Sequence, residues 1–144
     1  MAIVRTRSEK PMDDTAQKNL FVEVWTSFRN IPLWVQLWMV FWLVPINAAS
    51  LLFWQEENGL WVALLANIAM LLNLPVMAYE RRISRTMALP HLPFWTPLVV
   101  LILWMTPDLS TTYGVYLWVL AATNSLSLAF DYADAVRWFN GDRD

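Results

Sequence analysis

The stretch from Leu33 to Trp54 constrains this chain most, because it runs for 22 residues without a charged side chain. An α-helix rises about 1.5 Å per residue, so a helix of this length covers the roughly 30 Å hydrocarbon core of a bilayer. Pro45 lacks the N–H that the carbonyl of Phe41 would use, so we expect a kink there. The segment predicts a membrane span, and its polar residues predict neighbouring helices.

Three further apolar segments predict three more spans, at about residues 59–79, 92–109 and 113–133. The third of the four spans is the weakest, since the uncharged run Phe94–Thr106 covers only about 20 Å. We place the start of its helix near Pro93, because proline is tolerated in a first helical turn. The chain is therefore predicted to be an all-α integral membrane protein, with four transmembrane helices within residues 32–139 and a hydrophilic end at 140–144.

Residues 1–31 predict a cytoplasmic tail followed by an amphipathic surface helix. Leu20, Val24 and Phe28 recur at helical spacing within residues 14–30. We expect this helix to lie on the membrane surface, with packing against a soluble partner domain as the alternative. The segment lacks the apolar core of a signal peptide, so we expect the first span to stay in the mature protein.

All ten basic residues fall in three of the five segments outside the predicted spans. The N-terminal segment has five, the loop with Arg81, Arg82 and Arg85 has three, and the C-terminal end has two. The loops around Glu56 and Asp108 have none. Because cytoplasmic segments are enriched in Lys and Arg, this pattern predicts four crossings with both termini in the cytoplasm. Without a transit peptide, it is typical of a bacterial inner (cytoplasmic) membrane.

The chain has no cysteine and a single histidine, His91. This composition argues against thiolate chemistry and against the common zinc and haem sites, so we expect no metal and no cofactor. The net charge of −2 provides no field for binding nucleic acid. Ten tryptophans are typical of a protein in contact with a lipid bilayer. We interpret His91 as a solvated or hydrogen-bonded structural residue, with titration or ligand binding as the alternative.

Trp34, Trp38 and Trp42 fall four residues apart and form one aromatic stripe on the first span. Trp34 is expected at interfacial depth, whereas the other two are expected deeper, where an indole N–H has no water to use. We expect this stripe to pack against other helices. The alternative is a site for a flat apolar molecule such as a quinone, a carotenoid or a porphyrin-type pigment.

Three asparagines within the predicted spans are candidates for contacts between helices, namely Asn47, Asn67 and Asn73. Asn67 shares a helix face with the small residues Ala63 and Ala66, which let another helix approach closely. Asn73 lies about 240° further round the helix, so we expect it to contact a different neighbour. A polar cavity lined by these amides is the alternative.

The last predicted span carries a polar stripe along one helix face, made of Asn124, Ser127, Asp131 and Asp134. Ala121 and Ser125 add a small-xxx-small pair beside it. An acid inside a membrane span is a candidate for moving protons or cations. We favour ion pairing of both aspartates with arginines at the cytoplasmic end, namely Arg81, Arg82, Arg85 or Arg137. The three loop arginines are also candidates for contact with lipid head groups.

We expect a non-catalytic membrane protein that serves as a structural or accessory subunit or an assembly factor. It would pack through Trp-rich and small-residue faces, as a homo-oligomer or within a larger membrane complex. The alternative is a small oligomeric transporter or ion-conducting protein, with a path lined by Asn47, Asn67, Asn124 and Asp131. An enzyme acting on lipid through Asp131, Asp134 and His91 ranks last, because no spacing ties these residues into an acid/base pair.

Overall fold

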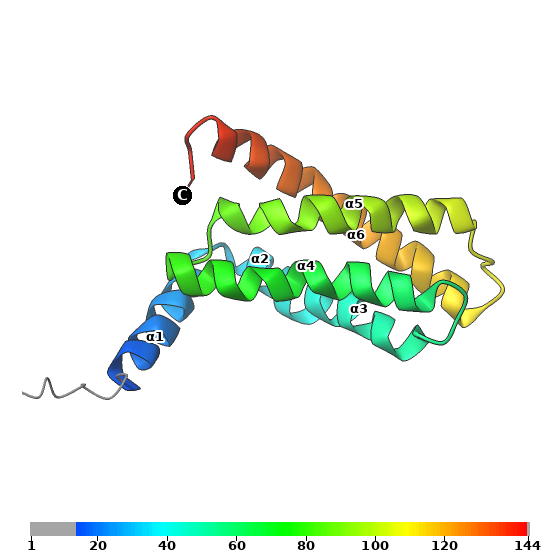
Figure 1. The fold of residues 1–144 in the computed structure, drawn as a ribbon, viewed down its shortest axis with the longest axis horizontal. Helices are drawn as coiled ribbons and strands as arrows, with labels where there is room; N and C mark the ends of the chain where they lie inside the picture. The colour runs from blue at the N-terminus through cyan, green and yellow to red at the C-terminus, as the bar shows by residue number, and fades with distance from the viewer. Residues whose placement is uncertain (1–13, 144) are drawn as a thin grey trace, which may run out of the picture.

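Four long helical segments run up and down beside one another, and a shorter helix projects from one end of them (Figure 1). The computed structural model describes residues 14–143, with side chains from residue 18 onward, and every regular element in this part of the chain is helical. Four segments are long and apolar enough to cross a membrane: Leu33–Phe53, Gly59–Glu80, Arg85–Met105 and Thr112–Phe139. The predicted all-helical class with four candidate spans is thereby confirmed.

The helices occur in the order α1 (Asp14–Asn30), α2 (Leu33–Trp38), α3 (Val44–Ala48), α4 (Gly59–Glu80), α5 (Ala88–Met105) and α6 (Thr112–Phe139). A π-helical segment, Met39–Leu43, joins α2 to α3, and 3₁₀ segments follow α3 at Ala49–Phe53 and precede α5 at Arg85–Met87. The first span is therefore one continuous helical path made of four pieces.

Around Pro45 the first span changes helix type, where the sequence predicted a simple kink. In the π-helical segment before the proline, the N–H of Val44 bonds to the carbonyl of Met39, five residues back. Because Pro45 has no N–H to give, a wider turn lets the chain pass it without the regular pattern of donors. The side chain of Asn47 also donates to the carbonyl of Leu43 at 3.0 Å, so it assists the backbone beside the irregular turn.

The third and fourth spans differ from their predicted bounds. The third was expected over residues 92–109, but it begins with the 3₁₀ turn at Arg85 and ends at Met105. Its start lies earlier because Pro90, and not Pro93, lies in the first turn of α5. A proline is tolerated there, since the N–H that it lacks would have had no partner within the helix. Thr106 ends the helix in the left-handed conformation, with φ of 45°. The fourth helix continues past residue 133 to Phe139.

The core lies between α4, α5 and α6. Trp95 and Leu98 on α5 are fully buried, as is Leu120 on α6. Ala66 and Ala69 of α4 are also fully buried, and these small residues let α5 approach the α4 backbone. Most large apolar residues outside this core are exposed on the outer faces of the helices. This arrangement is the one expected for a bundle whose solvent is apolar.

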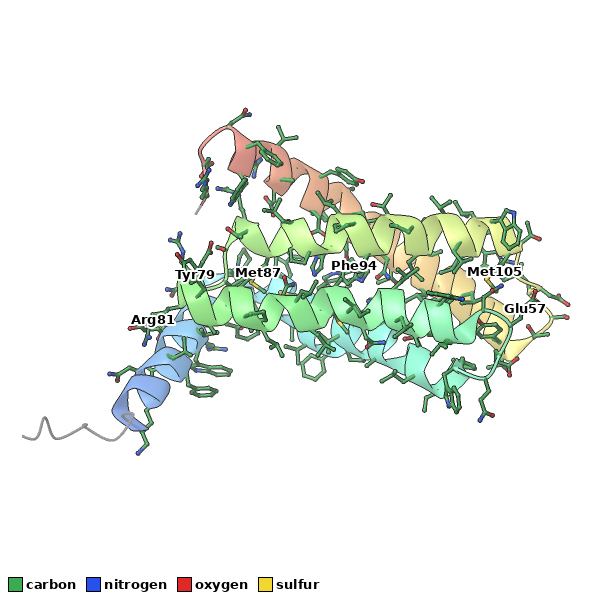
Figure 2. All side chains as sticks on the ribbon, in the orientation of Figure 1. Glu57, Tyr79, Arg81, Met87, Phe94 and Met105 are labelled. Carbon is green, nitrogen blue, oxygen red and sulfur yellow. The ribbon has the colours of Figure 1, made fainter. Side chains whose placement is uncertain are left out.

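The two ends of the bundle differ in their charged residues, and Figure 2 labels residues at both ends. We call one the basic end, made of α1, the α4–α5 connection and the end of α6, and the other the acidic end, made of residues 54–58 and 106–111. The labelled Arg81 and Tyr79 lie at the basic end, and Glu57 lies at the acidic end. All Lys and Arg residues among positions 14–143 belong to the basic end. The predicted N-terminal tail, with Arg5, Arg7 and Lys10, falls outside the described residues.

Helix α1 has the bounds that its sequence pattern predicted, and two contacts hold it to the α4–α5 connection. Glu23 forms an ion pair with Arg81. The hydroxyl of Ser27 accepts a hydrogen bond from the backbone N–H of Ile83 at 3.0 Å. The rings of Phe21 and Trp25 stack on one another and remain exposed. The helix is therefore fixed at its C-terminal half while presenting aromatic rings outward.

Candidate functional site

A group of four polar side chains, which we call the amide cluster, lies inside the bundle and consists of Asn47, Ser50, Asn67 and Asn124. The amides of Asn47 and Asn124 exchange two hydrogen bonds, of 2.9 and 2.8 Å. Asn67 donates to the hydroxyl of Ser50 at 2.9 Å, and that hydroxyl donates to the carbonyl of Asn47 at 2.5 Å. Asn47, Ser50 and Asn124 are fully buried. The cluster joins the first span to α4 and α6.

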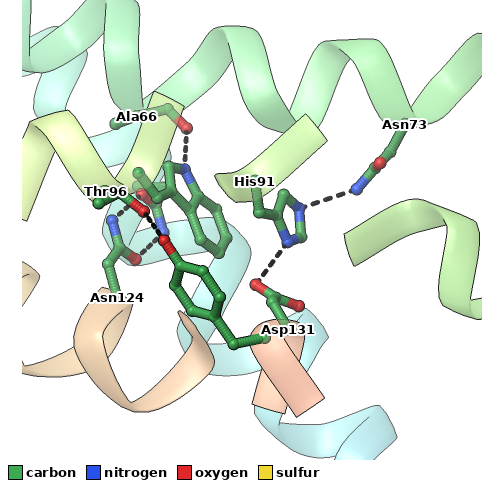
Figure 3. Close-up of polar contacts among 9 residues, drawn as sticks. Ala66, Asn73, His91, Thr96, Asn124 and Asp131 are labelled. Atoms are coloured by element: carbon green, nitrogen blue, oxygen red, sulfur yellow. Dashed lines mark hydrogen bonds and ion pairs between the residues drawn. The ribbon is translucent and has the colours of Figure 1, made fainter. Parts of the chain in front are cut away.

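A second group, which we call the histidine chain, lies closer to the basic end and consists of Asn73, His91 and Asp131 (Figure 3). The Nδ1 atom of His91 is 2.9 Å from a carboxylate oxygen of Asp131, and its Nε2 atom is 2.9 Å from Nδ2 of Asn73. Asn73 lies on α4, His91 on α5 and Asp131 on α6, so one imidazole ring links three helices. The side chains of His91 and Asp131 are 12% and 15% exposed, respectively.

The hydrogen-bond roles in the histidine chain depend on where the imidazole carries its protons. A neutral imidazole with its proton on Nδ1 donates to the carboxylate of Asp131 and accepts from the amide N–H of Asn73 at Nε2. The Oδ1 atom of Asn73 is then buried without a partner. Rotating this amide by 180° would present Oδ1 to a proton on Nε2, which is the arrangement that a doubly protonated ring requires. The chain can therefore accommodate either protonation state of His91.

Trp95 lies between the two groups. Its ring stacks on His91, with 3.9 Å between ring centroids and 12° between planes. Its Nε1 atom donates to the carbonyl of Ala66 at 3.1 Å, next to Asn67 of the amide cluster. Because Trp95 is fully buried, it fills the space between the histidine chain and the amide cluster with an apolar ring. The polar residues thus form two separate groups.

The predicted polar stripe on α6 faces the interior, but its four members have different surroundings. Asn124 belongs to the amide cluster, and Ser127 is buried with a hydroxyl that has no hydrogen-bond partner within residues 14–143. Asp131 pairs with His91, and not with an arginine as we expected. Asp134 lies one turn nearer the basic end and pairs with Arg85 at 3.4 Å. Arg85 therefore pairs with Asp134, whereas Asp131, which lies further from the basic end, pairs with His91.

The three arginines of the α4–α5 connection take part mainly in contacts within the protein. Arg81 pairs with Glu23 of α1. Arg85 pairs with Asp134 and, at 2.5 Å, with Asp142 beyond the end of α6. Arg82 is exposed. Arg81 and Arg85 therefore both pair with carboxylates, but only Arg85 meets one of the two aspartates that we expected, namely Asp134.

The aromatic stripe of the first span lies largely on the outside of the bundle. Trp34 is exposed, Trp38 is half-buried, and the rings of Trp38 and Trp42 are 6.5 Å apart. Trp42 is 44% exposed, yet its Nε1 atom donates to the hydroxyl of Thr123 on α6 at 3.0 Å. The deepest member of the stripe therefore hydrogen-bonds to a neighbouring helix while much of its ring stays exposed.

The sequence did not identify the pairing of His91 with Asp131 or the role of Thr123. The spacing of four between His91 and Trp95 places them on one helix face and was a usable signal for their stacking. The partner of Asp131 depends on how α5 and α6 are aligned, which no local pattern encodes. Within the described part of the chain, no three His, Cys, Asp or Glu side chains are placed to hold a metal ion. No family model, curated protein or solved structure matches the chain.

Proposed function

We propose that this protein crosses a bacterial inner (cytoplasmic) membrane four times, with both termini in the cytoplasm and α1 lying on the membrane surface. The tryptophans support this placement. Trp34, Trp54, Trp61 and Trp104 lie at the ends of spans and are exposed, as residues at a membrane interface are. Trp42 and Trp95 lie at mid-span, and each donates its indole N–H to an acceptor inside the bundle. Neither therefore needs a water molecule as a partner.

Within that membrane we propose that the protein serves as a non-catalytic structural or accessory subunit, packed against itself or a larger complex. The observation that carries this proposal is on α6, where Ser125, Ala129 and Ala133 fall four residues apart and are all exposed. Small side chains at this spacing let helix backbones approach closely. The hydroxyl of Ser125 lies at mid-span and has no hydrogen-bond partner within residues 14–143. In apolar surroundings its partner would have to come from a neighbouring chain.

A non-catalytic role is also supported by the surroundings of His91. Both ring nitrogens are engaged, one by Asp131 and one by Asn73. A general base needs a free nitrogen within reach of a nucleophile or of water. In the described structure, the position that a nucleophile would take is held by the amide of Asn73.

The absence of native cysteine makes this proposal directly testable. Ala129→Cys, introduced alone, should form a disulfide with a second copy, or with a partner that has a cysteine at the contact, when membranes are oxidised before detergent is added. The mass of the product then distinguishes a homodimer from a complex. Val100→Cys on the exposed outer face of α5 is the matched control and should remain uncrosslinked. Ala129→Cys that stays monomeric, in a protein that also purifies alone in mild detergent, would contradict the proposed role.

The second candidate function is oligomeric transport of protons or cations, and the pairing of His91 with Asp131 is the observation that favours it. An acid and a histidine paired inside the bundle can exchange a proton. The fully buried Trp95 ring and the closed amide cluster oppose a continuous path through one copy. Proton flux into liposomes measures this directly. Flux that is present in the native protein and lost in Asp131→Asn would establish transport, and flux unchanged by that substitution would remove the residue from any path.

A further inference from the structure

A groove of about 470 Å³ opens at the basic end of the bundle, between the end of α4 and the end of α6. It is lined by the apolar and aromatic residues Pro75, Val76, Tyr79 and Trp138, which we call its floor, and by Glu80, Thr86 and Arg143, which we call its rim. Glu80 is the last residue of α4, and Trp138 is next to the last residue of α6. In the proposed membrane placement, which this inference requires, the groove therefore lies at the level of the cytoplasmic head groups.

The positive charge at the rim is held in place by an aromatic ring. The guanidinium carbon of Arg143 lies 4.2 Å from the centroid of the Trp138 ring. Trp138 is itself fixed, because its Nε1 atom donates to the hydroxyl of Thr86 at 2.9 Å. Arg85 and Arg137 lie within 4.0 Å of carboxylates, whereas Arg143 has no such carboxylate partner within residues 14–143. Its guanidinium therefore lies beside the groove with hydrogen-bond donors available for a ligand.

The negative charge at the rim is also positioned by neighbours. Each carboxylate oxygen of Glu80 accepts a hydrogen bond from a hydroxyl, one from Ser84 and one from Thr86. A carboxylate oxygen has two lone pairs, so each can still accept a further N–H donor. Because Thr86 bonds to both Glu80 and Trp138, it links the acidic and basic sides of the rim through one hydroxyl.

We propose that this groove binds a phospholipid with a primary-amine head group, of the phosphatidylethanolamine type. Its phosphate would bond to Arg143, its ammonium to Glu80, and an acyl chain would lie on Val76 and Tyr79. A purely anionic head group matches Arg143 but leaves Glu80 opposed to a like charge. A choline head group has the same charges but no N–H donor for the carboxylate.

The test is native mass spectrometry of the full chain in mild detergent, with phosphatidylethanolamine, phosphatidylcholine or phosphatidylglycerol of identical acyl chains added in turn. Phosphatidylethanolamine should bind about fivefold more tightly than either of the others, which corresponds to about 1 kcal/mol. Glu80→Gln should abolish that preference, whereas Arg143→Gln should weaken binding of all three lipids, because each carries the phosphate. Phosphoethanolamine without acyl chains should fail to compete at equal concentration, because it cannot use the apolar floor.

Arg137→Gln is the matched control, since Arg137 is an exposed arginine directly before Trp138 that does not line the groove. It should keep the lipid preference. Equal binding of all three lipids, or an Arg143→Gln protein that binds them as tightly as the native protein with an unchanged melting temperature, would overturn the proposal. Tighter binding of phosphatidylglycerol that Glu80→Gln strengthens further would overturn it as well. The Ala129→Cys crosslink does not involve this groove, so either proposal can fail while the other stands.

Discussion

The side-chain amides of Asn47 and Asn124 face each other across the bundle and exchange two hydrogen bonds of 2.8 and 2.9 Å, although 77 residues separate them in sequence. Both residues are fully buried. In apolar surroundings a buried amide cannot hydrogen-bond to water, so each asparagine supplies the hydrogen-bond partner of the other. This reciprocal pair fixes the first span against α6 at one rotation and one height.

Asn47→Ala should destabilise the protein by about 1–2 kcal/mol, because it leaves the amide of Asn124 buried without its partner. Reversible unfolding in mixed micelles measures this loss. The double variant Asn47→Leu, Asn124→Leu should recover part of it, since no polar group then remains unpaired. Asn140→Ala, at the exposed end of α6, is the control and should change stability by less than about 0.5 kcal/mol. Equal effects of Asn47→Ala and Asn140→Ala would show that the pair does not stabilise the fold.

His91→Phe should cost more than Asn47→Ala, at about 2–3 kcal/mol, because it leaves the mostly buried carboxylate of Asp131 without its partner. Phenylalanine can keep the ring contact with Trp95, so the loss isolates the polar link. Adding Asp131→Leu should restore stability toward that of the native protein. If the double variant is as unstable as His91→Phe alone, packing of the imidazole and not its pairing with Asp131 holds the helices.

Trp42→Phe should lower stability by about 1 kcal/mol, because the hydroxyl of Thr123 loses its indole donor. Trp34→Phe should have little effect, since Trp34 is exposed at the end of the span. A double-mutant cycle with Thr123→Val separates the hydrogen bond from the loss of ring area. A coupling energy of zero in that cycle would assign the whole effect to packing.

Glu23→Arg should release α1 from the α4–α5 connection by placing a like charge beside Arg81. A nitroxide at Val22→Cys, an exposed position on α1, should then become more mobile in electron paramagnetic resonance spectra. Adding Arg81→Glu should restore the native spectrum. The bundle itself should lose less than about 1 kcal/mol, because exposed ion pairs contribute little to stability. Unchanged label mobility in Glu23→Arg would leave Ser27 as the main anchor of α1.

The sequence predicted the helical class and the number of candidate spans, because uncharged runs and the distribution of arginines are encoded locally. Asn67 and Asn73 were expected to contact different neighbours, and they bond to Ser50 and to His91, respectively. The angle between positions on a helix is sufficient for that inference. The directions in which residues point from a single helix could therefore be predicted.

The partner of Asp131 could not be predicted in the same way. Choosing between His91 and an arginine requires the relative height of α5 and α6, and the start of α5 was placed five residues too late at Pro93. Moving that start toward the basic end brings His91 into the helix and level with Asp131. The change of helix type around Pro45 was missed for a related reason, since a proline predicts a disturbance but not which hydrogen-bond pattern replaces the regular one.

Single-cysteine accessibility tests the central claim, four crossings with the basic end in the cytoplasm, most directly. The four positions are Glu57, Arg82, Ser110 and Asn140, all exposed and each replaced by cysteine alone. In intact spheroplasts, a membrane-impermeant maleimide should label Glu57→Cys and Ser110→Cys at once. Arg82→Cys and Asn140→Cys should react only after the membrane is permeabilised. Labelling of Arg82→Cys and Asn140→Cys from opposite sides, or of all four positions in intact spheroplasts, would contradict the account.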